Sequence, residues 1–103
     1  MSFSFFDIPS IVEDKNLPFI MKRLEIEKFD KVKALTPAYK EKFRAILQDF
    51  FNKKINYEEA CKRTEIEIVP PPNYRRYSRW AERLVRTEAS KIFTLGYGDY
   101  LLS

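Results

Sequence analysis

The chain has 103 residues, of which 45% are hydrophobic and 16% aromatic, and it carries a formal net charge of +4. This length fits one domain, and the apolar content excludes a disordered chain. With no histidine and a single cysteine, Cys61, the sequence excludes an internal disulfide, a cysteine-histidine nucleophile and a zinc site built from the usual ligands.

An N-terminal arm or short helix is predicted over residues 1–15. Pro9 suits the first position of a helix, and Phe3, Phe5 and Phe6 need an apolar surface to pack on. Two alternatives are open for these three rings. They cover the core of the chain itself, or they dock on a partner protein.

A single helical domain, mainly α with three to four helices, is predicted over residues 16–95. Asn16 is the candidate cap of its first helix. The apolar spacing of this helix slips between Leu24 and Phe29. We therefore expect the helix to break near residues 25–28.

The strongest helical periodicity follows Thr36 and Pro37, a cap residue with proline in the first helical position. Apolar side chains recur there at steps of three and four residues: Tyr39, Phe43, Ile46, Leu47 and Phe50. This spacing predicts a helix at the centre of the core that ends near Asn52, with Leu84 and Ile92 of the last helix packed on it.

A short helix capped at Asn56 is predicted next, because Glu59 stands at the third position of a capping box. Cys61 lies on this helix and is expected to be a buried thiol. Residues 64–69 then alternate polar and apolar side chains, which predicts one short β segment. Three prolines at 70–72 lack backbone donors, so they predict an extended connector.

The last helix is predicted from Tyr74 to about Leu95, with Gly96 as its stop and residues 96–103 as an apolar C-terminal tail. Asn73 is a suitable cap for its start. The side that faces the core is predicted from five residues on one arc of the helix: Tyr77, Ala81, Leu84, Ile92 and Leu95. The opposite arc is left for solvent or for a ligand.

Five of the eight arginines of the chain lie on that opposite arc. They are Arg75, Arg76, Arg79, Arg83 and Arg86, and on a helix they share an arc of about 100°. Residues 70–103 carry six basic and three acidic side chains, whereas residues 1–69 carry 13 and 12. The excess positive charge therefore belongs to this segment. Arginine donors match phosphate oxygens and guanine edges, whereas an ordinary solvated helix face is the alternative interpretation.

The stretch from Ile55 to Ile66 resembles the first helix of helix-turn-helix proteins, with a capped start, paired acids and an alanine at the packing position. The resemblance implies that the arginine-rich helix is a recognition helix in the major groove of DNA. The connection from Glu65 to Asn73 is longer than in the usual motif, so the pattern indicates a variant. Four further residues extend the basic patch if the two helices lie together: Lys53, Lys54, Lys62 and Arg63.

A second resemblance concerns the segment from Glu82 to Glu88 and the following Gly96. It is similar to the Arg-Thr-Glu helix of phage head-morphogenesis proteins, which implies a virion or assembly component. The aromatic content and the apolar termini agree with that class, since aromatic residues are enriched at protein interfaces. The residues predicted to bind a partner protein are Phe3, Phe5, Phe6, Tyr97, Tyr100 and Leu101.

Two functions follow from these patterns. The first is a small basic nucleic-acid-binding protein, of viral, plasmid or chromosomal origin, whose arginine-rich helix contacts duplex DNA. The alternative is a helical assembly subunit, a class that includes homo-oligomers, whose arginines pair with an acidic protein surface. Neither function needs a cofactor or a metal. We expect no enzyme activity, because histidine and a glycine-rich phosphate loop are absent from the sequence.

The expected location is cytoplasmic. The N-terminus lacks the basic and apolar regions of a signal peptide, and no stretch of the sequence has the length and apolar character of a membrane span. The single cysteine gives the fold no dependence on an oxidising compartment. The sequence therefore predicts a soluble protein that has no membrane partner.

Overall fold

The computed structural model describes residues 8–32, 35–68 and 79–103, and within these ranges it has five α-helices and no strand. The helices are α1 (Ile8–Ile11), α2 (Leu17–Ile26), α3 (Pro37–Phe51), α4 (Tyr57–Glu67) and α5 (Trp80–Leu102). The predicted mainly α class is confirmed. None of these helices combines the length and the apolar character that crossing a membrane requires.

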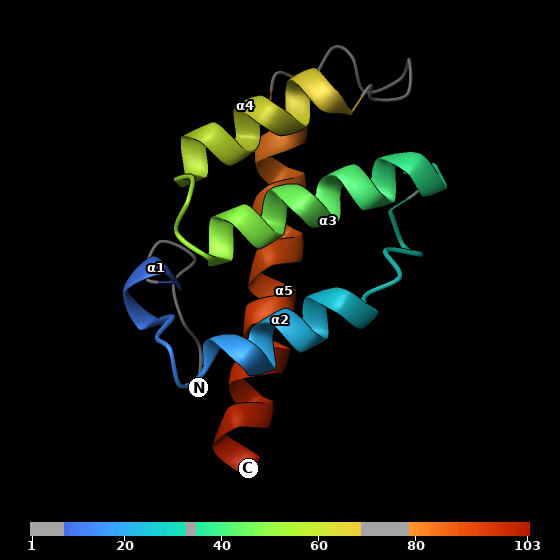
Figure 1. Ribbon diagram of the computed structural model, residues 1–103. Helices are drawn as coiled ribbons and strands as arrows, with labels where there is room; N and C mark the ends of the chain where they lie inside the picture. The colour runs from blue at the N-terminus through green and yellow to red at the C-terminus, as the bar shows by residue number, and fades with distance from the viewer. Residues whose placement is uncertain (1–7, 33–34, 69–78) are drawn as a thin grey trace.

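Three helices form a layer, and the longest helix crosses it. Figure 1 shows α2, α3 and α4 side by side, each running opposite to its neighbour, with α5 behind all three. α3 packs between α2 and α4, and both α2 and α4 pack on α5. The core therefore lies between the layer and the inner side of α5.

The predicted core residues are all buried: Phe43, Ile46, Leu47, Phe50, Leu84 and Ile92. The α2–α3 connection adds Phe29, whose ring meets that of Phe43 edge-on with the ring centroids 5.3 Å apart. In the arm, Ile8 and Val12 are buried in the same cluster. This part of the arm therefore covers the chain's own core.

Two helix starts follow their predicted caps. The Thr36 hydroxyl accepts a hydrogen bond from the backbone N–H of Tyr39 at the start of α3. Asn56 and Glu59 each accept from the other's backbone N–H, which completes the capping box of α4. The expected break after the first main helix is also present, because α2 ends at Ile26 and the next residue is extended.

Asn16 does not cap α2 in the predicted way. Its side-chain oxygen accepts from the backbone N–H of Glu13 at 2.8 Å, and its amide donates to the carbonyl of Ile11 at 2.9 Å. The side chain is buried, so these bonds satisfy polar groups that water cannot reach. Asn16 thus ties the arm to α2 and makes no side-chain bond to the helix itself.

The β segment predicted over residues 64–69 is wrong for residues 64–67, because α4 continues through Glu67. The Thr64 hydroxyl donates to the carbonyl of Ala60 at 2.8 Å, so this buried polar group is satisfied within the helix. Thr64 and Ile68 are both buried and stand four residues apart, which is a helical spacing. Val69 lies outside the described residues.

Gly96 is not the end of the last helix, because α5 runs on to Leu102 and includes most of the predicted tail. A Cβ atom on Gly96 would lie 2.5 Å from the Cα of Ile20 and 2.8 Å from its backbone nitrogen. The glycine therefore permits close contact between α5 and α2. The predicted start at Tyr74 lies outside the described residues, within which α5 begins at Trp80.

Candidate nucleic-acid interface

Three of the five clustered arginines lie within the described residues, at the start of α5. Arg79, Arg83 and Arg86 follow one another at steps of four and three residues, and all three are exposed. Arg79 and Arg83 form no ion pair with any described side chain. Arg75 and Arg76 lie outside the described ranges.

Arg86 is positioned by α4. Its guanidinium carbon lies 5.9 Å from the centroid of the Tyr57 ring, which is a cation–π distance. The Tyr57 hydroxyl donates to the backbone carbonyl of Glu82 at 3.4 Å, so the ring bridges the two helices. Of the three described arginines, Arg86 therefore has the most defined orientation.

The buried side of α5 explains why these arginines face outward. Its buried residues recur at helical steps: Ala81, Leu84, Val85, Glu88, Ala89, Ile92, Phe93 and Gly96. On a helical wheel this stripe lies opposite Arg79 and Arg83. Leu95, predicted to face the core, is 40% exposed because it lies at the edge of the stripe. Tyr77, which was also predicted to face the core, lies outside the described residues.

A partly buried charge cluster holds the middle of α5 to the end of α2. The Lys91 ammonium donates to the Glu27 carboxylate at 2.9 Å and lies 3.1 Å from that of Glu88, as an ion pair without hydrogen-bond geometry. Burial lowers the pKa of Lys91, but the bond to Glu27 and the charge of Glu88 outweigh this and raise it. The Glu88 side chain is 8% exposed, so its charge faces inward.

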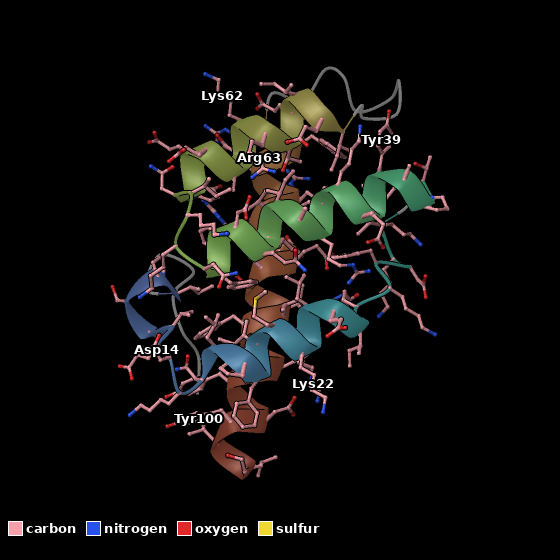
Figure 2. The ribbon with its side chains drawn as sticks, viewed as in Figure 1. Asp14, Lys22, Tyr39, Lys62, Arg63 and Tyr100 are labelled. Atoms are coloured by element: carbon pink, nitrogen blue, oxygen red, sulfur yellow. The ribbon has the colours of Figure 1, made fainter. Side chains whose placement is uncertain are left out.

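The predicted extension of the patch divides into two groups. Lys53, Lys54 and Lys62 are exposed. Arg63 lies between α4 and α3, where its guanidinium donates to Asp49 at 2.6 Å and to Glu67 at 3.0 Å, while Lys62 points away from the molecule (Figure 2). Because two carboxylates hold Arg63, its charge is already compensated within the fold.

Cys61 is a buried thiol, as predicted. Burial raises its pKa, and this effect outweighs the hydrogen bond to Tyr57, which lowers it. The thiolate is therefore disfavoured at neutral pH. Among the described residues, no group of three acidic or thiol side chains is placed to hold a metal ion.

The predicted partner-binding residues near the C-terminus differ in their surroundings. The Tyr97 ring stacks on Phe93 with centroids 5.6 Å apart, and the Tyr100 ring, visible in Figure 2, meets Phe19 edge-on at 5.7 Å. Leu101 is 56% exposed. Phe3, Phe5 and Phe6 lie outside the described residues.

A surface groove next to these rings was not predicted. It is lined by Pro18, Phe19, Lys22, Arg23 and Ile26 of α2 and by Asp99 of α5. Arg23 donates to both carboxylate oxygens of Asp99, at 2.5 and 2.8 Å. Among its lining residues, Ile26 is 59% exposed. Sequence patterns gave no signal for this groove, because its two sides are far apart in the chain.

No protein-family model matches the chain, and no curated protein or solved structure shows significant similarity to it. α4 and α5 do pack on each other, which the helix-turn-helix resemblance requires, but their connection lies largely outside the described residues. Function is therefore inferred from the side chains themselves.

Proposed function

We propose that the protein binds nucleic acid and contacts its phosphates with the arginine face of α5, here defined as Arg79, Arg83 and Arg86. One observation carries this proposal. Arg79 and Arg83 are exposed without an ion pair to any described residue, whereas Arg23, Arg44 and Arg63 each donate to acceptors within the fold. Arg75 and Arg76 stand a few positions before Arg79 in the sequence.

The physical basis is counterion release. Each arginine that neutralises a phosphate releases a condensed cation from the nucleic acid, so affinity falls as salt rises. For duplex DNA the slope of log K against log salt is about −0.9 for each phosphate contact. α5 holds the arginines in line, since its other side is buried against the layer. In this arrangement α5 takes the part of the recognition helix and α4 supports it.

A charge-reversal experiment tests the proposal. The double variant Arg79→Glu, Arg83→Glu is compared with the parent in binding to random duplex DNA across a salt series. We expect strong loss of affinity and a salt slope smaller in magnitude by about 1.8, because two contacts are lost. Thermal unfolding followed by circular dichroism is the control that tests whether the variant remains folded.

The matched control is Lys28→Glu, Lys31→Glu. Both lysines are exposed and lie in the α2–α3 connection, and the change in net charge is the same. If both double variants lose affinity equally, net charge alone determines binding. If the arginine variant binds as the parent does while folded, the proposal is wrong.

A second candidate function is an assembly subunit, favoured by the exposed apolar side chains near the C-terminal end of α5. Leu101 and Leu102 are 56% and 88% exposed, and Ile26 beside the groove is 59% exposed. Exposed apolar residues that lie together mark protein contact sites. In light scattering, Leu101→Lys, Leu102→Lys should convert an oligomer to a monomer. An unchanged mass for the parent and the variant would remove this candidate.

A further inference from the structure

The outer side of α5 carries hydrogen-bond donors well beyond its arginines. Thr87 and Thr94 are exposed and Ser90 is half-buried, and with Arg83 they follow at steps of four, three and four residues. Residues at these steps share one side of a helix. From Arg79 to Thr94 this strip is about 22 Å long, at a rise of about 1.5 Å per residue.

Carboxylates are kept away from the centre of this strip. Between Arg79 and Thr94, Glu88 is turned inward and paired with Lys91. Glu82 is exposed but lies on the edge of α5 that faces α4, where its charge raises the pKa of the buried Cys61 thiol. The strip thus offers arginine and hydroxyl donors, both of which contact the backbone of nucleic acids.

The position of α5 fits one kind of groove. Because α5 crosses behind the layer in Figure 1, its outer side projects as a single helix without a neighbour among the described helices. An α-helix with its side chains is about 10–12 Å across, and the major groove of B-form DNA is about 12 Å wide. The major groove of A-form RNA is too deep and narrow to admit a helix.

The aromatic rings near the arginines are engaged elsewhere. Proteins that bind single strands stack bases on exposed rings. Here Trp80 is partly buried against the core, and Tyr57 packs against the core and beneath Arg86. Among the described residues, this face therefore favours the backbone of a duplex over unstacked bases.

We infer that the ligand of this face is B-form duplex DNA, with α5 lying in the major groove and contacts reaching from Arg79 to Thr94. The inference rests on the proposed function and makes it specific in two ways. It selects duplex DNA over duplex RNA and single strands, and it extends the contact surface past the arginines to Thr87 and Thr94.

The first test compares ligands. The full chain is titrated with duplex DNA, duplex RNA and single-stranded DNA of the same sequence and length at one salt concentration. We expect duplex DNA to bind about tenfold more tightly than the other two. Equal affinity for duplex DNA and duplex RNA overturns the inference, but it leaves the proposed function in place if the arginine variant still loses binding.

The second test blocks the major groove of the DNA. The same duplex is prepared with glucosylated hydroxymethylcytosine, whose sugars occupy the major groove, and a minor-groove ligand is used in parallel as a competitor. The parent protein should lose about tenfold or more of its affinity for the glucosylated duplex and ignore the competitor. Unchanged affinity for the glucosylated duplex excludes α5 from the major groove. This test needs no variant to fold.

The third test examines the extension of the strip. Thr87→Glu, Thr94→Glu places two carboxylates on exposed positions of α5, and Ala38→Glu, Ala45→Glu places two on exposed positions of α3 as the control. The first pair should weaken binding by about tenfold and the control by much less. If the threonine variant matches the control while Arg79→Glu, Arg83→Glu loses binding, the contacts end at the arginines. If the parent binds none of the three nucleic acids, the proposed function is wrong as well.

Discussion

The two halves of α5 use their charged residues in opposite ways. In the C-terminal half, Lys91 is paired with Glu27 and Glu88, and Asp99 is held by Arg23. In the N-terminal half, Arg79 and Arg83 are exposed and have no ion pair with a described residue. One helix thus has a part that is fastened to α2 and a part whose exposed arginines we propose as the contact with a ligand.

This difference distinguishes charged side chains that hold the fold together from charged side chains that are exposed without a partner among the described residues. Arg44 illustrates the structural kind, since its guanidinium donates to the carbonyls of Leu24, Glu25 and Glu27 and so caps the end of α2. It also lies over the ring of Phe29, 5.3 Å from the centroid. Arginines of this kind hold helices together, and their removal should affect stability before it affects binding.

The largest loss of stability is expected at the close contact between α5 and α2. Gly96→Ala places a Cβ 2.5 Å from the Ile20 Cα, so one backbone must move, at a cost of about 3 kcal/mol in unfolding free energy. Gly98→Ala is the matched control, because a Cβ there meets nothing within 4 Å. It should stabilise the helix by up to about 1 kcal/mol. Urea unfolding followed by circular dichroism measures both. Equal effects at the two glycines would contradict the close contact.

A smaller loss is expected from Arg44→Met. The side chain is 15% exposed, and its loss removes the charged donor from the carbonyls of Leu24, Glu25 and Glu27, which should cost about 2–3 kcal/mol. The same urea titration measures this change. A cost near zero would show that water replaces the guanidinium at the end of α2.

The pair between Arg23 and Asp99 should add a pH-dependent contribution. The hydrogen bond from Arg23 holds the pKa of Asp99 below its usual value. The pair therefore stabilises the fold above the unfolded pKa of about 3.9, and this stability is lost as the pH falls through the lower folded pKa. Melting temperatures of the parent and of Asp99→Asn should differ at neutral pH and converge in acid. A difference that persists in strong acid would mean that the pair is not its source.

The smallest change in stability is expected on the arginine face. Arg83→Met should change the unfolding free energy by less than about 0.5 kcal/mol, since no described group depends on this side chain. It is the matched counterpart of Arg44→Met. The two variants, compared by urea unfolding, test the contrast between available and structural arginines directly. A large loss at Arg83 would assign it to the structural kind.

Local signals in the sequence predicted much of this fold. The caps at Thr36 and Asn56 and the spacing of Phe43 and Phe50 depend on residues within a few positions of one another, and each prediction was confirmed. The side of α5 that carries the arginines followed from the same periodicity. Such features are readable because a helix brings neighbours in sequence together.

Two of the errors concern residues whose partners are distant in sequence. A glycine near a helix end usually stops the helix, but Gly96 is required by Ile20, which lies 76 positions earlier. In the sequence Arg63 could not be distinguished from the other basic residues of the predicted patch, because its partner Asp49 lies on another helix, α3. The alternation at residues 64–67 fitted a strand as well as one side of a helix, and contacts of Thr64 within α4 decided it. Pairing between helices set the first two outcomes, and a hydrogen bond within α4 set the third.

The buried Cys61 gives this protein a built-in reporter of motion. It is the one thiol of the chain, and it lies buried on α4, close enough to Glu82 and Arg86 of α5 for their charges to act on its pKa. A thiol reagent can reach it only when α4 separates from α5, so the rate of labelling measures how often that opening occurs. A ligand that braces α5 and α4 together slows the labelling. Binding can thus be followed through Cys61 without altering any residue of the arginine face.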